Sequence, residues 1–179
     1  MPITASVVIT FIYSAPKIPL FNALNRIARA KTFFLTVVWV YVTAVMYLLV
    51  KELPFDTPAI LFCLSRFFLI YCICILFDYR DREDDKRQGL TSLPVLVEGK
   101  ALKAIFFLSA TAFACFTVAL VKYQFSAVQV GILLVPGIIT ASLYEYARRN
   151  FSDYLYYFVL DGLMMLSALC TLLLSFKYF

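Results

Sequence analysis

The chain has 179 residues, of which 63% are apolar and only 15% are charged, and its mean hydropathy is +0.88. A soluble domain has about 45–50% apolar and about 25% charged residues, so this composition excludes an ordinary water-soluble fold. It also excludes a disordered chain, which requires low hydrophobicity. The sequence contains no histidine, which excludes Ser-His-Asp and Cys-His catalysis, HExxH zinc sites and histidine-ligated haem. We therefore expect an integral membrane protein whose chemistry depends on carboxylates, Lys, Arg, Tyr, Cys or a hard metal ion.

Long apolar stretches predict the fold. A helix needs about 20 mostly apolar residues to cross the hydrocarbon core of a membrane. Five stretches meet this requirement, at about 32–50, 58–77, 101–121, 127–147 and 154–176. They are too long and too continuous for alternating β-strands, and a sixth stretch, Ile3–Tyr13, is too short to span. The prediction is an all-α integral membrane protein with one membrane domain over residues 1–179, a bundle of five transmembrane helices plus a partial N-terminal helix.

The basic residues predict the orientation of this bundle. If the segment 78–100 faces the cytoplasm, twelve of the 16 Lys and Arg residues lie on that side, three lie on the other, and Arg66 lies within a span. This distribution satisfies the positive-inside rule, and we expect a prokaryotic plasma membrane. The net charge of +5 is then a topology signal. Because no nucleic-acid-binding module is recognisable, we expect no nucleic-acid partner.

A charged segment follows the second predicted span. Nine of the ten residues from Asp78 to Arg87 are charged. If the span continues as a helix, Asp81 and Asp85 lie about 60° and about 20° from Asp78 around the axis, so three carboxylates share one face. Their repulsion favours a divalent cation, and Mg²⁺ binds one or two carboxylates together with water and phosphate. The pattern predicts a Mg²⁺-diphosphate site at the cytoplasmic mouth of the bundle. The basic side chains that could hold the remaining phosphate oxygens are Arg82, Lys86 and Arg87. The alternative is a solvated charged segment with intrahelical ion pairs.

The segment Asp78–Pro94 resembles the second aspartate-rich motif of UbiA-type membrane prenyltransferases. The DxxxD core of that motif matches Asp81 and Asp85, an aspartate precedes it, and Gly, Thr, Ser and Pro follow it. Upstream, Tyr13 and Lys17 match the YxxxK motif of the family. The resemblance covers the whole chain.

The resemblance implies a nine-helix membrane enzyme that uses Mg²⁺ to transfer an isoprenoid chain from a polyprenyl diphosphate to a small acceptor. The acceptor is often aromatic, in quinone or lipid biosynthesis, and the five spans correspond to the C-terminal half of that fold. By this resemblance the metal ligands are Asp78, Asp81 and Asp85, the catalytic residues are Tyr13 and Lys17, and the diphosphate-binding residues are Lys17, Arg82, Lys86 and Arg87.

The first motif of the family, NxxxDxxxD, is absent, because no Asn in the sequence is followed by Asp at four and eight residues. We therefore expect a fragment, or else a half-protein whose partner is another chain, and no transferase activity from this chain alone. Two other protein classes are alternatives. A non-enzymatic membrane protein, such as half of a transporter, would suit intramembrane Arg66 and Asp161. A CDP-alcohol phosphotransferase is also Asp-rich, but its DG-x-x-AR pattern is missing.

Arg66 lies near the middle of the second predicted span, where a charge costs about 2.5–3.5 kcal/mol on insertion scales. We expect an ion pair with Asp161 or Glu145. Tyrosines near the cytoplasmic end fit an interfacial belt, and these are Tyr144, Tyr146, Tyr154, Tyr156 and Tyr157.

Overall fold

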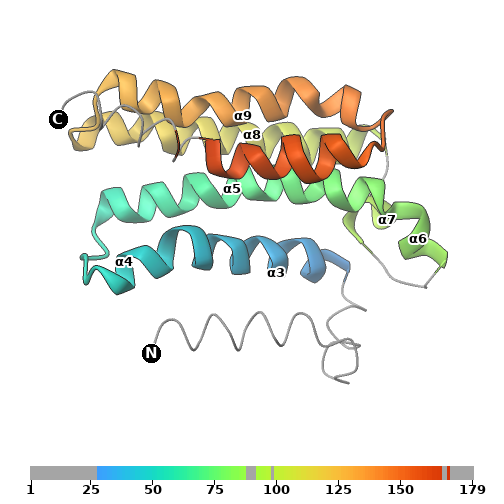
Figure 1. The fold of residues 1–179 in the computed structure, drawn as a ribbon, viewed down its shortest axis with the longest axis horizontal. Helices are drawn as coiled ribbons and strands as arrows, with labels where there is room; N and C mark the ends of the chain where they lie inside the picture. Colours follow the sequence, from blue (N-terminus) through green and yellow to red (C-terminus); the bar gives the residue numbers. More distant parts are fainter. Residues whose placement is uncertain (1–27, 88–91, 98, 167–168, 170–179) are drawn as a thin grey trace.

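The computed structural model describes residues 28–87, 92–97, 99–166 and 169, and every element within these ranges is a helix. Figure 1 shows the long helices side by side in one bundle. The prediction of an all-α fold with helices able to span a membrane is confirmed. The predicted partial helix at Ile3–Tyr13 lies outside the described residues.

The helices follow the predicted spans closely. The first span combines α3 (Ala28–Val40), the π-helical turn η1 (Tyr41–Val45) and α4 (Met46–Val50). It is followed by α5 (Thr57–Arg80) and by two short helices, α6 (Arg82–Arg87) and α7 (Leu93–Leu96). The third and fourth spans are α8 (Lys100–Ala119), extended by the 3₁₀ turn η2 (Leu120–Tyr123), and α9 (Ala127–Ala147). The fifth, Tyr154–Leu166 in the described part of the chain, begins as the π-helix η3 (Tyr154–Leu160) and is called the last helix below.

Local sequence signals fix where these helices begin. The Asp56 carboxylate accepts a 3.0 Å hydrogen bond from the Ala59 amide and so caps α5. At the start of α9, Ser126 and Gln129 form a reciprocal capping box, which satisfies two amides that the helix itself leaves without partners. Residues 124–126 alone join η2 to α9, and Gln124 adopts a left-handed conformation (φ 68°) in this turn.

Helix α5 is the centre of the bundle. In Figure 1 it lies between the α3–α4 segment and the pair α8 and α9, with the last helix alongside. Its residues Leu69, Ile73 and Leu76 are buried in a core shared with Phe106 of α8 and Tyr156 of the last helix. Both faces of α5 are thus covered by protein, so groups at its end are held by neighbours on several sides.

Close packing holds α8 against α9. Gly137 of α9 faces the ring of Phe113, and a Cβ added at Gly137 would overlap that ring. Pro136 lies inside α9, and the Thr140 hydroxyl donates a 2.7 Å hydrogen bond to the Pro136 carbonyl. A small residue at the contact lets the two helices approach closely, as is common between membrane helices.

Candidate functional site at the polar end of the bundle

The polar end of the bundle is defined here as the end where α5 and α9 terminate and where α3, α8 and the last helix begin, at the right of Figure 1. Side-chain contacts connect all five helices there. α3 reaches α5 through Thr32 and Asp78, and α5 reaches the last helix through Arg80 and Tyr157. Further contacts are Arg148 to Tyr79, Lys103 to Glu145 and Tyr156 to Ala147.

Asp78 lies in the last turn of α5 and is only 3% exposed. One of its carboxylate oxygens accepts a hydrogen bond from the hydroxyl of Thr32, which is fully buried on α3. A buried carboxylate must be hydrogen-bonded or paired to offset its loss of hydration. The first of the three predicted metal ligands is therefore oriented by the neighbouring span.

Asp81 marks a break in the acidic segment. Helix α5 ends at Arg80, and Asp81 follows it with φ −82° and ψ 0° before α6 begins. The three carboxylates would share one face if the second span continued as one helix through Asp85, and this condition is not met, because the helix is interrupted at Asp81. The Asp81 side chain is 42% exposed and accepts a 2.8 Å hydrogen bond from Nε of Arg80.

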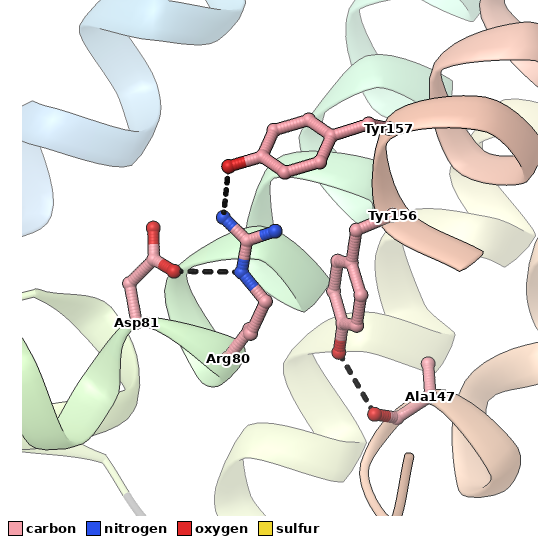
Figure 2. Close-up of polar contacts among 5 residues, drawn as sticks. All are labelled: Arg80, Asp81, Ala147, Tyr156 and Tyr157. Atoms are coloured by element: carbon pink, nitrogen blue, oxygen red, sulfur yellow. Dashed lines mark hydrogen bonds and ion pairs between the residues drawn. The ribbon is translucent and has the colours of Figure 1, made fainter. Parts of the chain in front are cut away.

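Arg80 occupies an aromatic pocket at the end of α5, shown in Figure 2. Its guanidinium carbon lies 4.7 Å from the centre of the Tyr157 ring and 4.9 Å from that of Tyr156. Nη2 donates a 3.0 Å hydrogen bond to the Tyr157 hydroxyl. Nη1 is buried and has no hydrogen-bond partner among the described residues. The cation is thus held by rings on the last helix and by the carboxylate of the residue that follows it in the chain.

Tyr156 connects the last helix to the end of α9. Its hydroxyl donates a 2.8 Å hydrogen bond to the Ala147 carbonyl (Figure 2), and the side chain is completely buried. The carbonyls of the last turn of a helix lack partners within the helix, so this bond satisfies one of them. It also fixes the turn 148–153 that separates the two helices.

The short helix α6 has a buried side and a solvated side. Asp85 is 5% exposed, whereas Glu83 and Asp84 are exposed. The basic residues pair with these exposed carboxylates. The N···O distances are 3.1 Å for Arg82–Glu83, 3.8 Å for Lys86–Glu83 and 3.6 Å for Arg87–Asp84. The ion pairs on the solvated side match the alternative interpretation, a solvated charged segment with intrahelical ion pairs. The burial of Asp85 does not match that alternative.

The predicted metal ligands do not form a complete metal site by themselves. Within residues 28–87, 92–97, 99–166 and 169, no three His, Cys, Asp or Glu side chains are grouped so that they could hold a metal ion. Carboxylates are nevertheless the oxygen donors that Mg²⁺ prefers, and Mg²⁺ commonly takes only one or two of them. Asp78, Asp81 and Asp85 fit part of such a site. Tyr13 and Lys17 lie outside the described residues.

A second polar cluster lies between α5, α8 and α9. Glu145 accepts a 2.6 Å hydrogen bond from Nζ of Lys103 and lies 3.8 Å from Nη1 of Arg148. Arg148 also contacts the Tyr79 hydroxyl at 3.4 Å, and this hydrogen bond raises the pKa of Arg148 above its ordinary value. The guanidinium thus connects Tyr79 of α5 with Glu145 of α9 and keeps the end of α9 against α5.

The expected ion pair of Arg66 is wrong, and the expected tyrosine belt is wrong for two of its five residues. Glu145 pairs with Lys103 and Arg148 rather than with Arg66. Arg66 is buried, its guanidinium lies 5.0 Å from the centre of the Phe62 ring, and within the described part of the chain it forms no ion pair with Asp161 either. The predicted tyrosine belt also divides into two groups. Tyr144 and Tyr156 are buried in the core, whereas Tyr146, Tyr154 and Tyr157 are exposed.

Sequence reasoning missed the roles of Arg80 and Tyr157. Arg80 is one of nine charges in ten residues, so its position in the sequence does not distinguish it from its neighbours. Two signals could have pointed to these residues. Arg80 follows the last apolar turn of a span directly, and two adjacent tyrosines begin another span. A cation at a membrane interface commonly lies against aromatic rings.

Comparison with known proteins gives one match. The sequence model of the UbiA prenyltransferase family matches residues 2–176 of this chain. No curated protein and no solved structure matches it.

Proposed function

Because the chain belongs to the UbiA prenyltransferase family, we propose that it takes part in Mg²⁺-dependent transfer of an isoprenoid chain from a polyprenyl diphosphate to a small acceptor. The observation that carries this proposal is the acidic segment at the polar end of a membrane bundle. Two of its carboxylates, Asp78 and Asp85, are buried. Acidic side chains are almost never fully buried unless they are paired, and a divalent cation is one kind of partner that carboxylates take.

Mg²⁺ would supply positive charge that stabilises the departing diphosphate, and it would hold the diphosphate at the protein. Asp78, Asp81 and Asp85 would hold the ion directly or through water, and diphosphate oxygens would complete its coordination shell. Asp78 is oriented by Thr32 and Asp81 by Arg80. These contacts support the proposal because hydrogen-bonded carboxylates need little rearrangement when a ligand arrives.

Arg82, Lys86 and Arg87 are the described cations that we assign to the diphosphate, with Lys17 as a fourth. The three described cations pair with the exposed Glu83 and Asp84. In the Arg87–Asp84 pair both side chains are exposed, and exposed ion pairs are worth only about 0–1 kcal/mol, so Arg87 can exchange a carboxylate for a phosphate oxygen at little cost. Tyr13 would lie beside the diphosphate as a further catalytic residue.

The rest of the bundle supports the handling of a hydrophobic substrate. Four described helices are long and apolar enough to cross a membrane, and the acidic segment follows the end of one of them, α5. A diphosphate with an isoprenoid tail has this same division between a charged head and an apolar chain. Departure of the diphosphate leaves positive charge on an allylic carbon, and a dry surrounding protects that centre from water.

The absence of an NxxxDxxxD motif leads to a second part of the proposal. Transfer requires a further protein segment that supplies this motif, and the chain alone does not turn over. Fusing the first helices of a complete family member to the N-terminus of this chain tests this directly. Transfer by the fusion and none by the chain alone is the expected result, whereas turnover by the chain alone would contradict it.

The substrate assignment is tested by binding. The chain is reconstituted in lipid nanodiscs, and retention of radiolabelled geranylgeranyl diphosphate is measured with millimolar Mg²⁺ and with EDTA. We expect retention that depends on Mg²⁺ and is competed by inorganic diphosphate but not by geranylgeraniol at equal concentration. Retention that is the same with EDTA would contradict the proposed Mg²⁺-diphosphate site.

A further inference from the structure

Arg80 lies where the acidic segment meets the last helix. On one side its Nε donates a 2.8 Å hydrogen bond to Oδ1 of Asp81. On the other side its Nη2 donates a 3.0 Å hydrogen bond to the hydroxyl of Tyr157, which is 77 residues away in the chain. One guanidinium therefore joins a predicted metal ligand to a different membrane helix.

The Asp81 carboxylate depends on this contact for its orientation. The side chain is 42% exposed and follows the end of α5, where the backbone leaves the helical conformation. Arg80 is the residue that hydrogen-bonds and pairs with this carboxylate among the described residues. The bond engages Oδ1 and leaves the other carboxylate oxygen available to an incoming ion.

The last helix is shaped to hold Arg80. Its first seven residues form the π-helix η3, a rare conformation that is often found at functional sites. The adjacent residues Tyr156 and Tyr157 both place their rings within 5 Å of the guanidinium carbon. A fork-shaped guanidinium can stack on rings and donate hydrogen bonds in fixed directions at the same time, which a lysine ammonium cannot do.

We propose that Arg80 is a positioning residue that fixes the Asp81 carboxylate and is itself fixed by Tyr157, so that the last helix sets how tightly the acidic segment holds Mg²⁺ and diphosphate. The inference rests on the proposed function, because it concerns the same site. Its physical basis is that hydrogen-bond partners of metal-binding carboxylates control the geometry of those ligands, and their loss typically lowers metal affinity by about 10–100-fold.

Tyr157→Phe tests the inference because it removes one hydroxyl and keeps the ring over Arg80. The matched control is Tyr154→Phe on the same helix, whose side chain is exposed and stacks on Phe158. For each chain in nanodiscs, binding of radiolabelled inorganic diphosphate is titrated with Mg²⁺, and the thermal midpoint is measured without Mg²⁺. We expect Tyr157→Phe to raise the half-saturating Mg²⁺ concentration about tenfold, with thermal midpoints equal in the two variants.

Arg80→Lys is the second variant, since it keeps the positive charge but loses the planar guanidinium with its hydrogen-bond donors in fixed directions. We expect it to raise the half-saturating Mg²⁺ concentration at least as much as Tyr157→Phe, and the double variant to resemble Arg80→Lys alone. If wild type responds to Mg²⁺ and Tyr157→Phe has the wild-type half-saturation, the inference is wrong and the proposed function stands. If wild type shows no Mg²⁺-dependent binding of diphosphate, the proposed function and the inference are both overturned.

Discussion

The hydroxyl of Thr32 donates a hydrogen bond to a carboxylate oxygen of Asp78, across 46 residues of sequence and between two membrane-spanning helices. Both side chains are buried. The contact fixes the start of α3 against the end of α5, and it does so through the aspartate with which the acidic segment begins. Stability of the bundle and geometry of the candidate site are therefore connected at this point.

Thr32→Val should destabilise the bundle by about 1–2 kcal/mol, because the buried Asp78 loses a donor that no solvent can replace. Thr32→Ser keeps the hydroxyl and should stay close to wild type. The control is Thr43→Val on the same span, because among the described residues the Thr43 hydroxyl bonds only the Trp39 carbonyl of its own helix, at 2.7 Å. Unfolding in mixed detergent–SDS micelles gives the free energy of unfolding of all three variants. Equal losses of stability in Thr32→Val and Thr43→Val would contradict the prediction.

Asp85→Asn should abolish Mg²⁺-dependent binding of diphosphate, and Asp81→Asn should do the same. Each change replaces a charged oxygen donor by a neutral amide in a site that needs negative charge for Mg²⁺. Asp84→Asn is the matched control, since Asp84 lies in the same short helix but is exposed and pairs with Arg87. The Mg²⁺ titration in nanodiscs distinguishes the three variants, and wild-type binding by Asp85→Asn would refute the assignment of Asp85 as a ligand.

Gly137→Ala should destabilise the chain by about 1–3 kcal/mol, because the added methyl group overlaps the Phe113 ring and the tightly packed helices must separate. Gly131→Ala on the same helix is the control. Nothing lies within 4 Å of a Cβ added at that position, so this change should be neutral or stabilising by about 0.5–1 kcal/mol. Phe113→Leu should reduce the cost of Gly137→Ala if the overlap is its cause, and unfolding of the single and double variants gives this coupling.

Tyr156→Phe should lower the free energy of unfolding by about 0.5–1.5 kcal/mol, because the Ala147 carbonyl loses its buried donor. The ring remains against Arg80, so the half-saturating Mg²⁺ concentration should not change. Tyr157→Phe is expected to have the opposite pattern, with an altered Mg²⁺ response and little loss of stability. Measuring both quantities on both variants separates the two tyrosines, and a Mg²⁺ shift in Tyr156→Phe would show that the ring pocket acts as one unit.

Labelling with a membrane-impermeant maleimide tests the predicted orientation. In a cysteine-free background, a cysteine at position 84 should react only from the cytoplasmic side, whereas a cysteine at position 122 should react only from the opposite side. The expectation follows from the excess of Lys and Arg around the acidic segment. Position 84 is on the exposed side of α6, and position 122 is in the turn after α8. Reaction of both cysteines from one side would contradict this topology.

The helices were predictable because hydropathy acts locally. The predicted fourth span, 127–147, coincides with α9 (Ala127–Ala147), where a capping box marks the start. The second span was predicted three residues short, since α5 continues through Asp78 and Tyr79 to Arg80. The predicted span ended at Phe77 because hydropathy falls at the charged Asp78. The helix itself continues, since another helix supplies a hydrogen-bond donor for that charge, the hydroxyl of Thr32.

The candidate site was predictable only in part. The spacing of Asp78, Asp81 and Asp85 identified the segment, but an ideal helix gave the wrong backbone at Asp81. The expected partner of Arg66 was also wrong, because opposite charge within the membrane does not indicate which helices are neighbours. Contacts such as Arg80 to Tyr157 depend on how helices distant in sequence pack together, and neither spacing nor composition contains that information.

The turn between α8 and α9 bears on how the chain enters the bilayer during synthesis. Only residues 124–126 separate two apolar helices, and the one charged side chain near that turn is Lys122. Both helices can therefore partition into the membrane together as a hairpin. In the predicted orientation, the polar part that has to be translocated is a single lysine with a few uncharged residues. The apolar residues of both helices favour insertion, so the free energy of burying two spans in the membrane offsets the cost of moving one short turn across it.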